Sequence, residues 1–295
     1  MSIADLLSAS PLLFAGIVFA FSLLVGSFLN VVIHRLPLMM ERDWEMQCRE
    51  LRGESLEPEP EPYNLTVPRS RCPKCDSPIT ALQNIPVVSY LWLRGRCANC
   101  RTKISVRYPL VELATAILAS IVAYRFGFGY EALAGIYLTF VLVALSGIDI
   151  DKQLLPDSIV LPSLWIGLLM SLAHPLAEAQ TLFIKPSDAI IGAAAGYMIL
   201  YTVANLFRLL TGKIGMGNGD FKLLAVFGAW LGVAKLPLII LLSAGVGSVL
   251  GIAMIVFAGR DKQIPIPFGP YLAAAGYLAL LYGDTLMSSY LGLFQ

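Results

Sequence analysis

Long apolar runs separated by short polar segments make up most of this 295-residue chain. A helix that crosses the hydrocarbon core of a bilayer needs about 20 apolar residues. With glycine, proline and charged residues taken as boundaries, the runs predict eight spanning helices, at roughly 11–33, 108–124, 131–148, 158–173, 187–207, 221–234, 236–258 and 268–290. Only 14% of the residues are charged, against about 25% in soluble domains. This composition excludes a soluble enzyme, a disordered protein and a secreted disulfide scaffold. We therefore expect an all-α, polytopic membrane bundle.

The charged residues are concentrated in one hydrophilic segment, 34–107, which holds 12 of the 21 Lys and Arg residues and all five cysteines. We expect a cytoplasmic loop domain here, between a first transmembrane helix within 1–33 and a helical bundle formed by 108–295. The first ten residues contain no basic residue, so the first helix is expected to be retained and not cleaved as a signal peptide.

The distribution of basic residues predicts the orientation in the membrane, because Lys and Arg near helix ends lie mainly on the cytoplasmic side. With eight spans and an outside N-terminus, 18 basic residues fall on the cytoplasmic side and three on the other. Both termini are therefore predicted to lie outside the cytoplasm.

Four cysteines of the loop form two Cys-x-x-Cys pairs, Cys72 with Cys75 and Cys97 with Cys100. Two such pairs suit a closed tetrahedral site in which four thiolates bind zinc. Two separate redox pairs, or unligated thiols, are the alternative, and a reducing cytoplasm favours zinc. Cys48 lies outside the pattern and is expected to be a free thiol.

The loop also divides by charge. Segment 41–61 carries eight acidic and three basic residues and ends in a Pro/Glu run, a composition that favours an extended or mobile strap. Segment 69–107 carries eight basic residues and one acidic residue. Attraction to anionic lipid is the plainer interpretation, and nucleic-acid binding is the alternative. We expect no nucleic-acid partner, because a module tethered between two spans has little access to a duplex.

Two aspartates lie at predicted helix ends, where ionisable groups are costly and so suggest function. Asp149 lies at the end of the third predicted span, and Asp220 follows a Gly-Asn-Gly sequence at the start of the sixth. The predicted topology places both at the cytoplasmic edge. Two carboxylates in a half-dry site share one proton, so the pair could activate water and protonate a carbonyl, as in aspartic proteases. N-capping is the alternative for Asp220 and for Asp157.

Several stretches together resemble the type IV prepilin leader peptidases, a family of membrane aspartic proteases. These stretches are Gly26–Pro37, the two Cys-x-x-Cys pairs, Arg107–Thr115, Asp149–Asp157, Gly217–Lys222 and Pro265–Tyr271. They occur in order and extend over most of the chain.

The resemblance implies an endopeptidase of the bacterial inner membrane. It would remove the basic leader of type IV prepilins and type II secretion pseudopilins at the cytoplasmic face. Asp149 and Asp220 match the catalytic aspartates, with Asp151 and Asp157 as the next candidates.

Many members of that family also methylate the new N-terminus with S-adenosylmethionine, and the four-cysteine loop is typical of them. We therefore expect zinc and S-adenosylmethionine as cofactors, although no motif marks the methyl-donor site. The oligomeric state is left open. A transporter or a membrane assembly protein with a zinc-binding loop is the alternative function.

Overall fold

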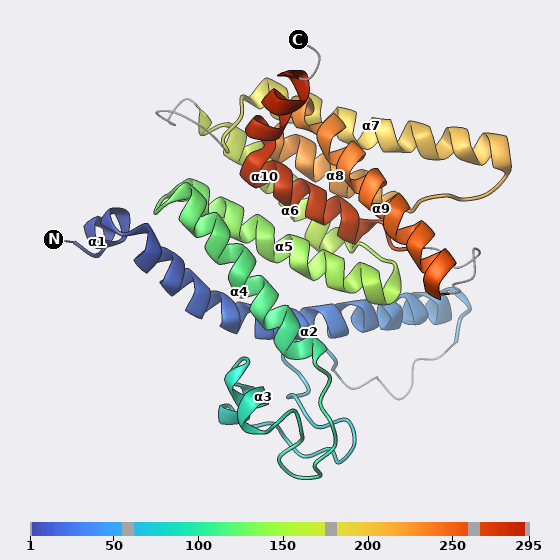
Figure 1. The fold of residues 1–295 in the computed structure, drawn as a ribbon. Coiled ribbons are helices and arrows are strands. Elements are labelled where there is room, and N and C mark those ends of the chain that lie inside the picture. The colour runs from blue at the N-terminus through green and yellow to red at the C-terminus, as the bar shows by residue number, and fades with distance from the viewer. Residues whose placement is uncertain (1, 55–61, 175–181, 259–265, 293–295) are drawn as a thin grey trace. The chain divides into compact units, whose positions relative to one another are not determined.

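The computed structural model describes residues 2–54, 62–174, 182–258 and 266–292, which are mainly helical (Figure 1). These ranges contain no strand, and β-structure is limited to two isolated bridges. The prediction of an all-α protein is confirmed. The contacts divide the chain into two compact units, Met1–Phe128 and Gly129–Gln295. The three-part division predicted from the sequence remains a proposal.

The first unit is built on two long helices that pack along each other (Figure 1). Its elements are α1 (Ile3–Ala9), α2 (Pro11–Leu51), η1 (Leu82–Asn84), α3 (Val88–Trp92) and α4 (Arg107–Phe126). Gly26 of α2 allows the close approach of α4, because a Cβ there would come within 2.7 Å of the Glu112 backbone. One turn further along α2, the Asn30 side-chain amide donates a hydrogen bond to the Tyr108 carbonyl, at 3.1 Å. Segment 69–107 between α2 and α4 is called the cysteine module below.

Helix α2 is longer than the predicted span 11–33, since it continues to Leu51. The prediction of an extended strap is wrong for 41–51, which are helical, and 55–61 lie outside the described residues. The predicted span ended where the charged segment begins, at residue 34, yet the helix continues through that point and contains Pro37.

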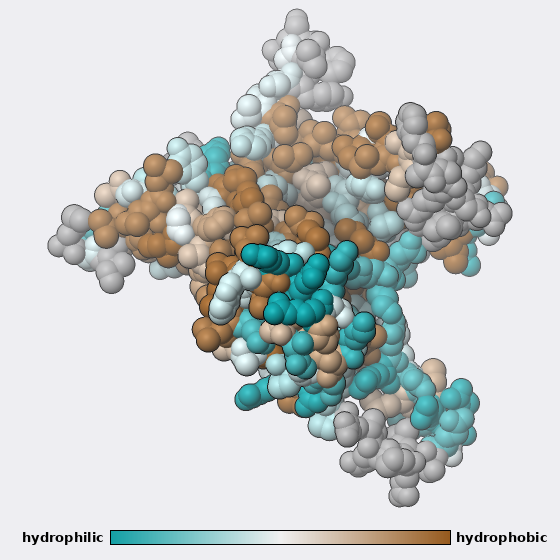
Figure 2. All heavy atoms as spheres, turned by 60° about the horizontal axis from the view of Figure 1, so that its bottom comes forward, coloured by the Kyte–Doolittle hydropathy of each residue, from teal (hydrophilic) through white to brown (hydrophobic). Residues whose placement is uncertain are grey.

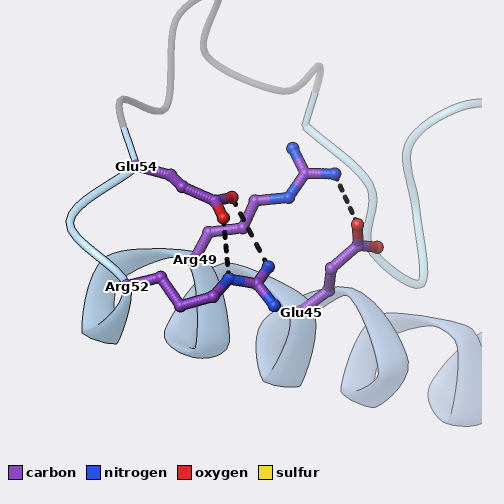
Figure 3. Close-up of polar contacts among 4 residues, drawn as sticks. All are labelled: Glu45, Arg49, Arg52 and Glu54. Atoms are coloured by element: carbon purple, nitrogen blue, oxygen red, sulfur yellow. Dashed lines mark hydrogen bonds and ion pairs between the residues drawn. The ribbon is translucent and has the colours of Figure 1, made fainter.

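Local interactions stabilise the part of α2 that follows its proline. Residues that favour helix, among them Met, Glu, Arg and Leu, dominate this part of the chain. Glu45 and Arg49 form an ion pair one helical turn apart, a spacing that stabilises helices, and Arg52 pairs with Glu54 just beyond the helix end (Figure 3). The acidic charge of this segment is therefore partly neutralised by its own arginines.

In the second unit, several helices pack around one buried helix. Its elements are α5 (Tyr130–Lys152), α6 (Asp157–Ser171), α7 (Pro186–Thr211), α8 (Asn218–Leu231), η3 (Val233–Lys235), α9 (Leu236–Ala258) and α10 (Gly269–Gly292). Helix α8 contacts α6, α7, α9 and α10 (Figure 1), and nearly all its residues are buried. Gly192 of α7 and Gly228 of α8 leave no room for a Cβ between these helices. The Trp230 indole donates to the Ser163 carbonyl of α6 at 2.8 Å.

The protein is a multi-pass membrane protein. By length and composition, α2, α4, α5, α7 and the segment Val233–Met254 could each cross a bilayer, and α6 is a shorter apolar helix. Large apolar side chains such as Phe21 and Leu24 are exposed, as lipid-facing positions require. Hydrophobic residues cover much of the surface seen in Figure 2. Each of the eight predicted spans overlaps a helix. However, the 14 residues of α8 extend only about 21 Å, less than the roughly 30 Å of a bilayer core. The number of eight spans therefore remains a prediction.

Candidate functional site

Asp149 lies in the last turn of α5 and is 5% exposed. The helix ends after Lys152 because Gln153 adopts the left-handed conformation, and the Gln153 N–H donates to the Asp149 carbonyl at 2.9 Å. The Gly269 N–H donates to Asp149 Oδ2 at 2.9 Å. Gly269 is the first residue of α10, so its N–H has no partner within the helix and belongs to the positive end of the helix dipole. The start of helix α10 thus holds the carboxylate of Asp149.

Asp220 lies in the first turn of α8 and is 8% exposed. Its N–H donates to the Gly217 carbonyl at 3.3 Å, and the Gly217 backbone interacts favourably with its carboxylate. An acidic residue is favourable here because the helix N-terminus carries partial positive charge. The carboxylates of Asp149 and Asp220 interact electrostatically. The fold therefore brings together two buried acidic groups that are far apart in sequence.

A leucine in the turn between α5 and α6 packs against two glycines beside these carboxylates. A Cβ on Gly219 would come within 2.7 Å of the Leu155 Cβ, and one on Gly269 within 3.2 Å of Leu155 Cδ2. The same Cβ on Gly269 would lie 2.7 Å from Asp149 Oδ2. Both glycines are thus needed for the close packing of the turn against the starts of α8 and α10.

The other two candidate aspartates lie in different surroundings. Asp151 is exposed. Asp157 begins α6, and Lys222 Nζ lies 2.7 Å from both of its carboxylate oxygens. The N-capping alternative is wrong for Asp157 and Asp220, because the N-cap residues are Pro156 and Gly217.

Sequence reasoning missed three partners of this site: Gly269, Leu155 and Lys222. All three lie in stretches that carried the family resemblance, which was the one available signal. No local pattern indicated which groups these residues contact, because each contact joins different helices.

The four cysteines of the two pairs form one cluster, with all Sγ atoms within 4.8 Å of one another. Zn–S bonds of about 2.3 Å in a tetrahedron separate the sulfurs by about 3.8 Å, and the Sγ atoms of Cys72 and Cys100 are 3.8 Å apart. The cluster therefore fits a zinc ion. Cys48 is a free, exposed thiol on α2.

Two turns of the same design present the cysteines. In the first, the Cys72 N–H donates to the Ser77 carbonyl; in the second, the Cys97 N–H donates to the Thr102 carbonyl. An antiparallel bridge closes each turn, Arg71 with Pro78 and Arg96 with Lys103. A hydrogen bond with the Ser77 hydroxyl is the main cause that lowers the pKa of Cys75 to about 6. This favours the thiolate, the form that binds metals.

Comparison with known proteins gives the family. Residues 20–126 match the model described as the bacterial peptidase A24 N-terminal domain, and residues 136–252 match the type IV leader peptidase family. A protein of Aeromonas hydrophila named prepilin leader peptidase/N-methyltransferase is 54% identical over 97% of this chain and 97% of its own length. The chain belongs to the type IV leader peptidase family. The resemblance seen in the sequence motifs is confirmed.

Other members of the leader peptidase family carry the same name. The relative from Pseudomonas aeruginosa is 52% identical over 99% of this chain and 98% of its own length. The relative from Neisseria gonorrhoeae is 48% identical, with 89% and 88% covered. No solved structure is significantly similar to the chain. Asp149 and Asp220 fall within the leader peptidase match, and the cysteine cluster falls within the N-terminal one.

Proposed function

We propose that this protein is a membrane aspartyl endopeptidase. It cleaves the basic leader from type IV prepilins and type II secretion pseudopilins and then methylates the new N-terminal residue. The observation that carries the proposal is that Asp149 and Asp220 are both buried and interact electrostatically, with Leu155 packed against Gly219 beside one and Gly269 beside the other. Family membership and the names of the relatives support it.

The chemistry follows from two acidic groups in a poorly solvated site. Such a pair shares one proton because two adjacent buried charges are costly. The ionised carboxylate removes a proton from water, and the water oxygen attacks the scissile carbonyl carbon. The protonated carboxylate donates to the carbonyl oxygen. The N–H of Gly269 holds the Asp149 carboxylate in place, and the Gly217 backbone interacts favourably with that of Asp220.

The cofactors are zinc and S-adenosylmethionine. Cys72, Cys75, Cys97 and Cys100 would hold zinc, which would cross-link the two turns of the cysteine module. S-adenosylmethionine supplies the methyl group, as the N-methyltransferase names of the relatives imply for those proteins.

The protein lies in the bacterial inner membrane, with its peptidase site at the cytoplasmic face and both termini in the periplasm. The distribution of basic residues supports this orientation. Prepilins reach that membrane with their basic leaders on the cytoplasmic side, by the same rule.

One experiment tests both activities. The purified protein is incubated with a prepilin, with and without S-adenosylmethionine, and the product is analysed by mass spectrometry. We expect loss of the leader in both samples and one added methyl group only in the sample with S-adenosylmethionine. An intact prepilin in both samples, from correctly folded protein, would contradict the proposal.

A further inference from the structure

The cysteine module carries a stretch of exposed apolar side chains next to the helix pair. No charged residue occurs from Ser77 to Leu93. The large side chains exposed in this stretch are Ile79, Leu82, Ile85, Val88, Leu91 and Trp92, and the last is 74% exposed. Single exposed apolar residues are ordinary, but a cluster of this kind marks a binding surface.

Helix α3 buries a polar side and exposes an apolar side, the opposite of a helix on the surface of a soluble protein. Ser89 is buried, and the Tyr90 hydroxyl donates to the Ile104 carbonyl at 3.4 Å, so the polar side of α3 faces the module. Val88, Leu91 and Trp92, spaced for one helical face, are exposed. The module is thus stabilised through the polar side of α3 and leaves the apolar side uncovered.

A hydrogen bond fixes the position of α3 along α4. The Val87 N–H, at the N-cap of α3, donates to Glu112 Oε2 at 2.8 Å. Glu112 is buried, and it lies five residues after Arg107, or about 7.5 Å along α4. Val87 has a φ of 59°, a strained conformation for a β-branched residue that persists only where its surroundings hold it. Helix α3 is therefore held beside the first two turns of a helix that is apolar and long enough to span the membrane.

Basic side chains adjoin this apolar surface. Arg94, Arg96, Arg101, Lys103 and Arg107 are all exposed. Figure 2 shows the module's end of the first unit, where hydrophilic side chains gather in the foreground with hydrophobic ones beside them. An apolar face with a tryptophan and adjoining arginines is the composition of segments that lie in a lipid interface, and basic residues near an anionic surface each contribute about 1 kcal/mol.

We propose that Leu82–Trp92 docks on the bilayer that α2 and α4 cross. The side chains of Leu82, Val88, Leu91 and Trp92 enter the boundary between headgroups and acyl chains, and the neighbouring arginines bind anionic headgroups. The occupant of the apolar surface is lipid because α3 is fixed at the level where α4 begins, and because the adjoining charges complement anionic phospholipid. This proposal does not depend on the peptidase or methyltransferase activity.

Tryptophan quenching tests the proposal with the full-length, zinc-loaded protein. The protein and its Trp92→Phe variant are placed in nanodiscs of phosphatidylcholine and phosphatidylglycerol, with or without bromine on the acyl chains. The difference between the two proteins reports Trp92. We expect brominated lipid to remove roughly half or more of this difference, since interfacial side chains reach about 5–10 Å into the boundary. Iodide in the water should have little effect on it.

Trp44 provides the matched control. It is also exposed, but it lies on the charged extension of α2 beyond the predicted span. The emission lost in a Trp44→Phe variant should be quenched by iodide and not by brominated lipid. If Trp92→Phe fails to fold, a loss of bound zinc will report it, and Leu82→Trp in the unaltered chain adds a second reporter at the same surface.

Two results would overturn the proposal. One is Trp92 emission that is quenched by iodide as strongly as Trp44 and is unaffected by brominated lipid. The other is Trp92 emission that is shielded from iodide only after a prepilin is added, which would make the surface a site for substrate.

Discussion

Gly269 illustrates how one residue without a side chain can control a carboxylate. Its N–H holds Asp149 Oδ2, and its missing Cβ leaves room for the same oxygen and for Leu155. Gly269 lies in one of the stretches that carried the family resemblance, but sequence reasoning did not single it out, and only the folded chain shows that it contacts Asp149. Its role depends on a contact between α5 and α10, which no local sequence pattern describes.

Gly269→Ala should therefore reduce cleavage. The added Cβ would lie 2.7 Å from Asp149 Oδ2, and a displacement of about 1 Å at a reacting group can cost roughly 100-fold in rate. We expect kcat for prepilin cleavage to fall at least tenfold. Gly245→Ala is the control, because nothing lies within 4 Å of that position. Equal rates for the two variants would show that Gly269 does not position the carboxylate.

The ion pair between Asp157 and Lys222 joins the starts of α6 and α8, two residues beyond Asp220. Because both side chains are partly exposed, the pair should contribute no more than about 1 kcal/mol to stability. Its expected effect is on the position of Asp220.

Asp157→Asn and Lys222→Met should each lower kcat severalfold, and the double variant should be no slower than the slower single variant. Lys235→Met is the control, since it breaks an ion pair between η3 and Asp284 of α10 and leaves the pair between α6 and α8 intact. Prepilin cleavage at saturating substrate measures all four variants. Losses that multiply in the double variant would rule out a shared role for the pair.

At the scale of elements, helix ends rather than helix centres form the candidate site. Apolar runs predicted the positions of all eight large helices well, because burial or lipid contact requires apolar residues whatever the neighbours are. The ends were less predictable. Helix α2 continues through Pro37, and helix-favouring residues and the Glu45–Arg49 pair stabilise the part that follows.

The cysteine pairs, unlike the helix ends, were predictable from local sequence, since a tight turn brings the two sulfurs of each pair together. We expect one zinc ion per chain in the purified protein. Cys97→Ser should lower the zinc content and increase proteolysis within the module, because metal binding and folding are coupled in such turns. Cys48→Ser, with its thiol outside the cluster, should retain zinc. Elemental analysis and limited proteolysis measure both effects, and equal zinc content in the two variants would contradict the assignment.

At the scale of the whole molecule, the scarcity of charge makes each charged residue informative. The division of 18 basic residues against three predicts an orientation that would place Asp149, Asp220 and the cysteine module on the cytoplasmic side of the membrane. Composition alone indicated a membrane protein, and the positions of the charges indicated where its chemistry occurs.

A reporter fused after Gln295 tests this orientation. Alkaline phosphatase, which is active only in the periplasm, should be active at that position, and a fluorescent protein that folds only in the cytoplasm should not be. The same reporters placed within the cysteine module should give the reverse pattern. A cytoplasmic C-terminus would contradict the topology, and together with a cytoplasmic cysteine module it would also contradict the count of eight spans.

The central claim is that Asp149 and Asp220 together cleave the prepilin. Its most direct test compares Asp149→Asn and Asp220→Asn with Asp151→Asn, an exposed aspartate on the same helix as Asp149, in one mass-spectrometric assay of leader removal. We predict that each of the first two substitutions lowers the cleavage rate by about 100-fold or more and that Asp151→Asn leaves it nearly unchanged. Cleavage at the normal rate by either the Asp149 or the Asp220 variant would contradict the account.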